Sequence, residues 1–312
     1  MHRGINPIRF ANEVNENFLN YQLTAFPFTD ENLNKQAKTL IKGDGTSSPM
    51  IKGPYVSLSK SFLEGMSIKE LEKMGKVHPA LQGVSPFPTL FKHQEKALLN
   101  IQQDKHCLVS TGTGSGKTES FMLPIIDYCL KLRDQGAREG IVAILVYPMN
   151  ALANDQLDRL RGMLVGSGIS FGMYVGNTPE NESKLGDYKR MTSKEGKKEY
   201  YQHKENTKTS NVIISPFEER LTEKEMIENP PRILLTNVNQ LELLLTRKKD
   251  ISMFVNAPLK YIVFDEVHTY SGAKGAEVSC LIRRLKAFCN KSADEVICIG
   301  TSATIADKED EG

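Results

Sequence analysis

The hydrophobic positions from residue 90 onward alternate between short apolar runs and longer amphipathic stretches. The runs are apolar at consecutive positions, which is typical of strands buried on both faces. They predict strands at 106–110, 141–148, 169–175, 232–236, 261–266 and 295–303. The stretches between them have helical spacing, and they predict helices near 117–133, 151–163, 237–247 and 276–289. Strands that alternate with helices favour an α/β fold, with a parallel sheet covered by helices on both faces.

Residues 1–88 do not follow this alternation. A helical pattern covers 10–21, and Ser67 and Glu70 have the spacing of a capping box at the start of a second helix. The proline-rich stretch 85–88 then interrupts the chain. We therefore predict an accessory region at 1–88, packed on a domain at 89–312.

Composition restricts the classes of function. The 312 residues include 40 Lys and Arg against 38 Asp and Glu, so a nucleic-acid partner would need a locally basic surface. The apolar runs are shorter than the roughly 18–20 residues that span a bilayer, and the first residues lack the apolar core of a secretory signal. The five Cys form no CxxC pair. We expect a cytoplasmic protein with no membrane contact and no structural metal.

A charged segment at 181–210 interrupts the second half of the chain. It has eight Lys or Arg, five Asp or Glu and three Tyr. One interpretation is a basic, aromatic surface that touches nucleic-acid backbone. The other is a solvated, partly mobile insertion whose charges keep it soluble. We favour the second, because charge runs are usually solvated.

The sequence TGTGSGKT at 111–118 follows a predicted strand and opens a predicted helix. Phosphates require convergent backbone N–H donors, and glycine lets the backbone approach them closely. In this pattern Lys117 would neutralise the β- and γ-phosphates and the Thr118 hydroxyl would ligate Mg²⁺. A chance glycine turn is disfavoured by the strand and helix on either side. The residues predicted to hold a nucleotide here are Thr111, Gly112, Thr113, Gly114, Ser115, Gly116, Lys117 and Thr118.

Two further groups stand at the ends of predicted strands. Asp265 and Glu266 follow an apolar run, at the sheet edge where α/β folds place their ligands. Asp265 would hold the Mg²⁺ shell, and Glu266 would orient or deprotonate the attacking water. Thr301, Ser302, Ala303 and Thr304 end the last strand. The small hydroxyls among them could relay the state of the γ-phosphate by hydrogen bonding, although ordinary strand-end residues would look the same.

Together these motifs resemble the first motor domain of superfamily 2 helicases over roughly 88–306. FKHQ at 91–94 resembles the Q-motif, which implies that Phe91 and Gln94 contact the adenine base. DEVH at 265–268 resembles motif II, with Val in place of the usual Ala, and implies a catalytic role for His268 beside Lys117, Asp265 and Glu266. Residues 302–304 resemble motif III, which couples hydrolysis to strand movement.

Three loops resemble those that grip the nucleic-acid backbone in this superfamily. YPMNALANDQ at 147–156 resembles motif Ia, and 176–178 and 236–237 resemble further loops. Two of the asparagines also stand where helices are predicted to begin, so a role as ordinary helix caps stays open. The residues expected to contact nucleic acid are Pro148, Asn150, Ala151, Gly176, Asn177, Thr178, Thr236 and Asn237.

The segment VFDEVHTYSGAKGAEVSCLIRRL at 263–285 is similar to the Lhr-like and Mrf-type DNA helicases, large bacterial forms of which occur in repair and anti-phage defence. The resemblance implies ATP and Mg²⁺ as cofactors and DNA, rather than RNA, as partner. It also implies a second RecA-like domain, in a missing C-terminal part or a partner chain. A nucleotide-gated DNA clamp without unwinding activity is the alternative, whereas a small-molecule kinase is disfavoured by motifs Ia, II and III.

The RecA-like fold implied by this resemblance makes a further prediction about the sheet. The strand at 295–301 should lie between the strands at 106–110 and 261–265. Lys117, Asp265 and Ser302 would then meet at one carboxyl edge.

Overall fold

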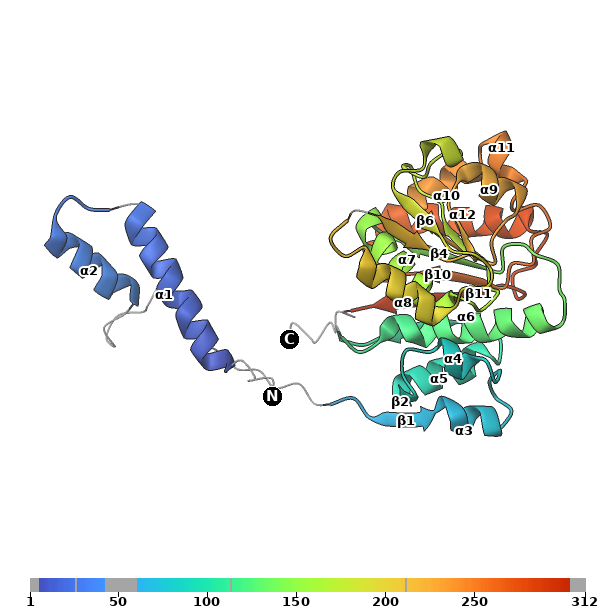
Figure 1. The fold of residues 1–312 in the computed structure, drawn as a ribbon, viewed down its shortest axis with the longest axis horizontal. Helices are drawn as coiled ribbons and strands as arrows, with labels where there is room; N and C mark the ends of the chain where they lie inside the picture. Colours follow the sequence, from blue (N-terminus) through green and yellow to red (C-terminus); the bar gives the residue numbers. More distant parts are fainter. Residues whose placement is uncertain (1–5, 26, 43–60, 113, 211, 304–312) are drawn as a thin grey trace. The chain divides into compact units, whose positions relative to one another are not determined.

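The fold is that of a computed structural model, which describes residues 6–25, 27–42, 61–112, 114–210 and 212–303 (Figure 1). Its contacts divide the chain into two compact units, 1–61 and 62–312. We refer to them as the N-terminal unit and the α/β unit, and each is described by itself.

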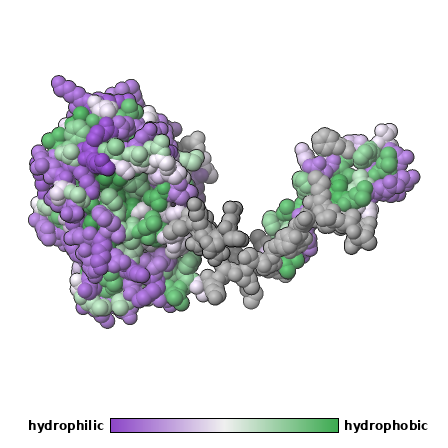
Figure 2. Space-filling view, turned by 180° about the vertical axis from the view of Figure 1, so that it is seen from behind, coloured by the Kyte–Doolittle hydropathy of each residue, from purple (hydrophilic) through white to green (hydrophobic). Residues whose placement is uncertain are grey.

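The N-terminal unit contains two helices, α1 (Pro7–Ala25) and α2 (Glu31–Lys42), that contact each other. The predicted helix at 10–21 is therefore confirmed and is longer at both ends. Asn6 caps α1 by accepting a hydrogen bond from the Ile8 N–H at 3.1 Å. Five large apolar or aromatic side chains on α1 remain exposed, namely Ile8, Phe10, Val14, Phe18 and Tyr21. Figure 2 shows hydrophobic surface on this unit.

A seven-stranded sheet forms the centre of the α/β unit, and every pair of neighbouring strands in it is parallel. The predicted α/β fold with a parallel sheet is therefore confirmed. In spatial order the strands are β3 (Cys107–Ser110), β11 (Ile297–Ser302), β10 (Tyr261–Phe264), β4 (Ala143–Tyr147), β9 (Ile233–Asn237), β5 (Phe171–Met173) and β8 (Glu219–Arg220).

Helices cover both faces of this sheet, as Figure 1 shows for α6 on one side and α12 on the other. Successive residues of a strand point to opposite faces, so Leu145 of β4 packs in one core and Val146 in the other. The first core includes α5 (Lys92–Ile101), α6 (Lys117–Asp134) and α7 (Asn150–Leu164). The second includes α9 (Glu223–Glu228), α10 (Val238–Leu244) and α12 (Gly272–Phe288).

The two units meet between residues 61 and 62, and not at the predicted boundary between residues 88 and 89. Residues 62–88 belong to the α/β unit, because Ile68, Leu71 and Leu81 are buried in the same core as α5 and α6. The predicted capping box is present, since Ser67 Oγ accepts from the Glu70 N–H at 3.2 Å. The elements of this segment are β1 (Glu64–Ser67), α3 (Ile68–Lys73), α4 (Leu81–Val84) and β2 (Thr89–Phe91), and β1 pairs antiparallel with β2.

Two residues of the charged segment at 181–210, Met191 and Tyr200, are buried in a small cluster with Val165 and Ile214, which lie on either side of the segment in the chain. The segment is therefore more ordered than the predicted solvated, partly mobile insertion. Cations of the segment are paired locally, for example Lys204 with Asp158 at 2.7 Å. The segment contains η1 (Glu182–Lys184), β6 (Tyr188–Arg190) and α8 (Lys197–Asn206), and β7 (Ile213–Ser215) follows it. Two short helices occur later in the chain, α11 (Lys248–Ile251) and η2 (Val267–Thr269).

We expect Leu71→Ala to lower the free energy of unfolding of the α/β unit by about 2–5 kcal/mol, because it removes a fully buried side chain from the core shared with α6. Urea denaturation of the whole chain, followed by circular dichroism, measures this change. Leu63→Ala is the matched control, since Leu63 is 78% exposed. An unchanged transition midpoint in Leu71→Ala would show that residues 62–88 do not support this fold.

Candidate nucleotide site and nucleic-acid interface

The order of three strands brings the predicted chemical motifs together. β11 lies between β3 and β10, as predicted. Its registers pair Ser302 with Ser110 and Gly300 with Phe264. The glycine-rich turn after β3, the acidic pair after β10 and the end of β11 therefore share one carboxyl edge of the sheet.

The glycine-rich turn has the backbone geometry of a phosphate-binding loop. Gly114 and Gly116 have φ values of +76° and +73°, a region that glycine enters readily. A side chain at position 116 would also collide with the Gln94 amide. Lys117 Nζ donates to the Thr111 carbonyl at 3.0 Å, so the ammonium is held across the loop. Thr113 lies outside the described residues.

The acidic pair is hydrogen bonded to the end of β11. The Thr301 hydroxyl donates to Asp265 Oδ1, and the Glu266 N–H donates to Thr301 Oγ1 at 3.4 Å. Glu266 has φ +50°, a left-handed conformation that is unusual for a residue with a side chain and is often found at functional sites. Thr301 is one of the strand-end hydroxyls singled out from the sequence, and the strand order shows that it is the one that contacts Asp265.

A second set of contacts joins the acidic motif to the motif III residues. His268 Nδ1 lies 3.1 Å from Ser302 Oγ and 3.3 Å from Glu266 Oε2. The Ala303 N–H donates to the same Glu266 oxygen at 3.3 Å. A change in the position of Glu266 would therefore be felt at the end of β11. Thr304 lies outside the described residues.

The charges around Asp265 suit a magnesium ligand. Burial raises the pKa of Asp265, and the negative charge of Glu266 raises it further. The hydrogen bond from Thr301 and the positive charge of Lys117 lower it. Asp265 and Lys117 are therefore near enough to interact, and Thr118 follows Lys117 at the start of α6. In the part of the chain described, no group of three His, Cys, Asp or Glu could hold a metal. The two oxygen donors Asp265 and Thr118 fit Mg²⁺, because this ion binds through one or two protein ligands together with the phosphates of a nucleotide.

Gln94 connects the start of α5 to the phosphate loop. Its side chain is 4% exposed, accepts from the Phe91 N–H at 2.8 Å and donates to the Gly116 carbonyl at 2.9 Å. His93 Nε2 lies 3.0 Å from the Ser115 carbonyl, and burial lowers the pKa of His93. Gln94 is therefore engaged with the loop itself, a contact different from the adenine contact expected from the resemblance.

The two asparagines of the predicted nucleic-acid loops meet. Asn237 Nδ2 donates to Asn150 Oδ1 at 2.8 Å, which joins the loop after β4 to the loop after β9. Asn237 Oδ1 also accepts from the Gln240 N–H at 2.7 Å, so this residue does cap a helix. Asn150 and Ala151 form the exposed first turn of α7. Pro148 precedes them and is half-buried.

Other predicted contacts are placed differently. Thr236 is fully buried and its hydroxyl donates to the Tyr174 carbonyl at 2.8 Å, so this side chain faces the interior. The Thr178 hydroxyl is likewise used within its own loop, donating to the Met173 carbonyl at 3.0 Å. Gly176 and Asn177 of the same loop are exposed. Backbone and exposed groups therefore remain available at these loops, whereas the two threonine hydroxyls do not.

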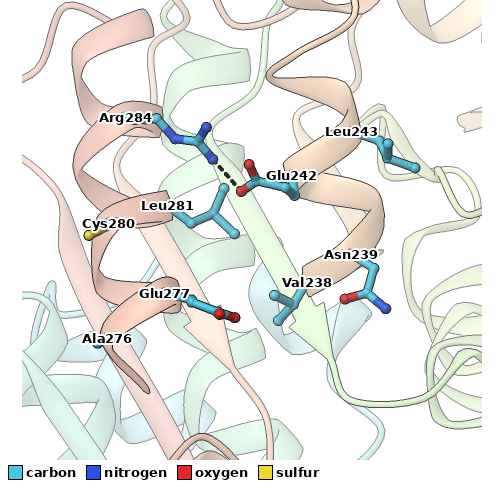
Figure 3. Close-up of a pocket in the computed structure, with 9 residues that line it drawn as sticks. All are labelled: Val238, Asn239, Glu242, Leu243, Ala276, Glu277, Cys280, Leu281 and Arg284. Atoms are coloured by element: carbon cyan, nitrogen blue, oxygen red, sulfur yellow. Dashed lines mark hydrogen bonds and ion pairs between the residues drawn. The ribbon is translucent and has the colours of Figure 1, made fainter. Parts of the chain in front are cut away.

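Two cavities adjoin at the first turn of α10. The smaller, of about 370 Å³, lies at the sheet edge and is lined by Tyr147, Pro148, Met149, Asn150, Asn237, Val238, Asn239, Tyr270 and Lys274. We call it the edge cavity. The larger, of about 890 Å³, lies between α10 and α12 and is crossed by the ion pair of Arg284 with Glu242 (Figure 3). None of the residues predicted to bind nucleotide or nucleic acid lines the larger cavity.

We expect Thr301→Val to weaken the affinity for Mg·ATP, because the variant keeps the shape of the side chain but removes the hydroxyl that orients Asp265. Loss of one hydrogen bond to a charged group predicts about a tenfold effect. Titration with a fluorescent ATP analogue in the presence of Mg²⁺ measures it. Thr301→Ser restores the hydroxyl and should bind as the unmodified chain does. Equal affinity in the Val and Ser variants would contradict the role given to Thr301.

Comparison with known proteins agrees with this geometry. The family model described as DEAD/DEAH box helicase matches residues 91–214 and 197–311. The Druantia protein DruE of Escherichia coli (strain UMEA 4076-1) is 30% identical over 95% of this chain and 20% of its own length. The ATP-dependent helicase Lhr-Core of Saccharolobus solfataricus is 28% identical over 72% of this chain and 22% of its own.

Solved structures support the fold. The DUF1998 helicase MrfA, in a crystal structure with DNA and AMPPNP, has a TM-score of 0.54 and 24% identity over 80% of this chain and 28% of its own. The DEAD-box helicase Mss116, bound to single-stranded RNA, has a TM-score of 0.56 and 19% identity over 80% of this chain and 43% of its own. The chain spans about a fifth of the length of DruE and Lhr-Core. It belongs to the DEAD/DEAH box helicase family, whose ATP-binding motor fold its α/β unit adopts.

Proposed function

We propose that this chain contains the first motor domain of an ATP-dependent DNA helicase or translocase that serves DNA repair or anti-phage defence. The observation that carries the proposal is the meeting of the phosphate loop, the acidic pair and the end of β11 at one sheet edge. Hydrogen bonds from Thr301 to Asp265 and between His268 and Ser302 connect these motifs. Family membership supports ATP as the nucleotide.

The residues at this edge would divide the work of phosphoryl transfer. Lys117 and the backbone N–H groups of the loop would hold the phosphates, and Thr118 and Asp265 would hold Mg²⁺, which supplies positive charge to the transferred group. Glu266 would orient the attacking water and accept its proton. Because Glu266 also accepts from the Ala303 N–H, the state of the nucleotide would be transmitted to β11.

Contacts to DNA would come from the neutral loops at the same edge. The exposed residues Asn150, Ala151, Gly176 and Asn177 and the half-buried Pro148 offer amides and backbone groups. Such groups reach phosphates and sugars without reading sequence. DNA is favoured over RNA by the resemblance of 263–285 to the Lhr-like and Mrf-type helicases, and by the structure of MrfA with DNA.

A second RecA-like domain would complete the active site. Arginine fingers from a second domain stabilise the charge that develops on the transferred phosphoryl group in such motors. The similar helicases are about five times as long as the part that this chain matches. We therefore infer that the second motor domain lies outside these 312 residues, either further along a longer chain or in a partner.

The 312 residues alone should bind Mg·ATP but hydrolyse it very slowly. An arginine finger is worth about 10³–10⁵ in rate in other nucleotide hydrolases, so turnover should be near background with or without DNA. Steady-state ATPase assays measure this, with Lys117→Ala as the variant that should also lose binding. Robust DNA-stimulated turnover by these residues alone would show that no further domain is needed.

Asn150→Ala should weaken binding to single-stranded DNA about threefold to tenfold and leave ATP affinity unchanged, because it removes an exposed amide from the first turn of α7. Fluorescence anisotropy with a labelled oligonucleotide measures DNA affinity, and a separate nucleotide titration measures ATP affinity. Asn229→Ala, at the exposed residue that follows α9, is the matched control. If Asn150→Ala has no effect but removal of 181–210 abolishes binding, that segment is the contact surface instead.

A further inference from the structure

We propose that α1 of the N-terminal unit associates with α1 of a second copy of this chain. The interface is an exposed line of side chains along the helix, which we call the α1 seam and which consists of Phe10, Val14, Asn17, Phe18 and Tyr21. The nucleotide and nucleic-acid motifs lie in the α/β unit, so this association goes beyond the proposed function and does not depend on it.

The helix α1 has two apolar faces, and one of them is exposed. Leu19 is buried, and Asn15 and Leu23, four residues to either side of it, are partly buried on the same face. The other described helix of the unit, α2, contacts α1. The apolar side chains of the α1 seam lie on a different face and remain between 45% and 66% exposed. A helix whose apolar surface extends beyond one face is typically covered by protein on both sides.

The spacing of the α1 seam is that of a helix that pairs with another helix. Phe10, Val14, Asn17 and Tyr21 follow one another at intervals of four, three and four residues. This alternation is that of the a and d positions of a heptad, whose side chains insert between those of a facing helix. Phe18 stands next to Asn17 and widens the apolar surface. The partner expected from this pattern is an α-helix.

The polar member of the seam, Asn17, indicates that the facing helix belongs to a second copy. Asn17 is exposed, and its side chain makes no hydrogen bond to the described residues. Against an apolar helix its amide would lose its hydrogen bonds to water without replacement, which is unfavourable. The amide of a second Asn17 offers both a donor and an acceptor. A single Asn in such a seam fixes the register and the number of paired helices.

The charges of α1 favour a protein partner over a lipid surface or a nucleic acid. Arg9 forms an ion pair with Glu13 at 3.1 Å, and Glu16 leaves the helix with more negative than positive charge. Helices that bind membrane surfaces or phosphate backbones are instead rich in Lys and Arg. None of the three charged residues belongs to the α1 seam, so two seams can meet without placing like charges in the middle of the interface.

The exposed surface is sufficient for a dimer of moderate affinity. Because an aromatic side chain presents about 150–250 Å², covering the apolar side chains of the seam in both copies would bury about 900 Å². Neighbouring positions of α1 would raise this area to the roughly 1,000 Å² that a specific interface needs.

The small size of the helix pair gives a reason for such an association. The two helices have 19 and 12 residues, and folds below roughly 40 residues usually need a disulfide, a metal or another chain. Residues 1–61 contain no Cys, and the described residues contain no group that could hold a metal. Another chain is the means of support that is left.

Sedimentation equilibrium of the 312 residues tests the interface. The unmodified chain should pass from monomer to dimer with a dissociation constant of about 1–100 μM. Phe10→Ser combined with Phe18→Ser removes two aromatic side chains from the seam and should weaken dimerisation at least about tenfold. Phe28→Ser is the matched control, because Phe28 is 50% exposed in the same unit but lies outside α1. A chain that stays monomeric above this concentration range, or that dimerises equally well in the double variant, would overturn the inference.

Opposite charges at position 17 test whether two copies meet on this face. Asn17→Glu and Asn17→Lys should each prevent dimerisation, because like charges would then face each other. An equimolar mixture of the two variants should form heterodimers, because opposite charges then meet. Dimers of either variant alone, or a mixture that stays monomeric, would show that the two Asn17 side chains do not face each other.

Other occupants of the seam are outcomes of the same experiments. If the chain is monomeric and binds neutral phosphatidylcholine vesicles through Phe10 and Phe18, lipid covers the seam and the inference is wrong. The circular dichroism of each variant should match that of the unmodified chain, because the substituted side chains are exposed. Affinities for Mg·ATP and single-stranded DNA should also be unchanged, so a failure of dimerisation would leave the proposed function standing.

Discussion

The hydrogen bonds that hold β11 between β3 and β10 are the constraint on which the candidate active site depends. The phosphate loop and the acidic pair follow strands that are not neighbours, and β11 spans the gap between them. Thr301 and Ser302 at its end contact Asp265 and His268, respectively. A displacement of β11 would alter the positions of Asp265, His268 and the residues at the end of the strand together.

A second connection joins the phosphate loop to the start of α5. Gln94 donates to the Gly116 carbonyl and caps the start of α5, and α5 shares its core with α3 and α4. The segment 62–88 therefore supports the loop through α5, although it carries none of the predicted chemistry. Because residues 62–88 share a core with α5 and α6, they belong to the α/β unit. The positive φ of Gly116 favours glycine there, and a side chain at this position would displace the Gln94 amide from the loop.

Six strands of the seven-stranded sheet, the place of β11 between β3 and β10, and the glycine-rich loop could be predicted, because each has a signal in the sequence: an apolar run, a motif order or a glycine spacing. The strand β8 has two residues, which is too short to give an apolar run. The direction of a side chain has no such signal in the sequence. Thr236 was predicted to contact nucleic acid, yet its hydroxyl donates to the Tyr174 carbonyl inside the protein. The contact of Thr301 with Asp265 could not be predicted, because the two residues are 36 positions apart in the chain and meet only in the sheet.

The near-zero net charge of the chain does not argue against a nucleic-acid partner. Lysines of the charged segment at 181–210 form ion pairs with nearby carboxylates, such as Lys204 with Asp158 and Lys184 with Glu180. The positive charge at the surface of this segment is therefore smaller than its number of Lys and Arg suggests. The exposed loops at the sheet edge carry neutral amides and backbone groups, at Asn150, Gly176 and Asn177. Such groups can hold phosphates without a high net charge, so the total charge of the chain says little about this partner.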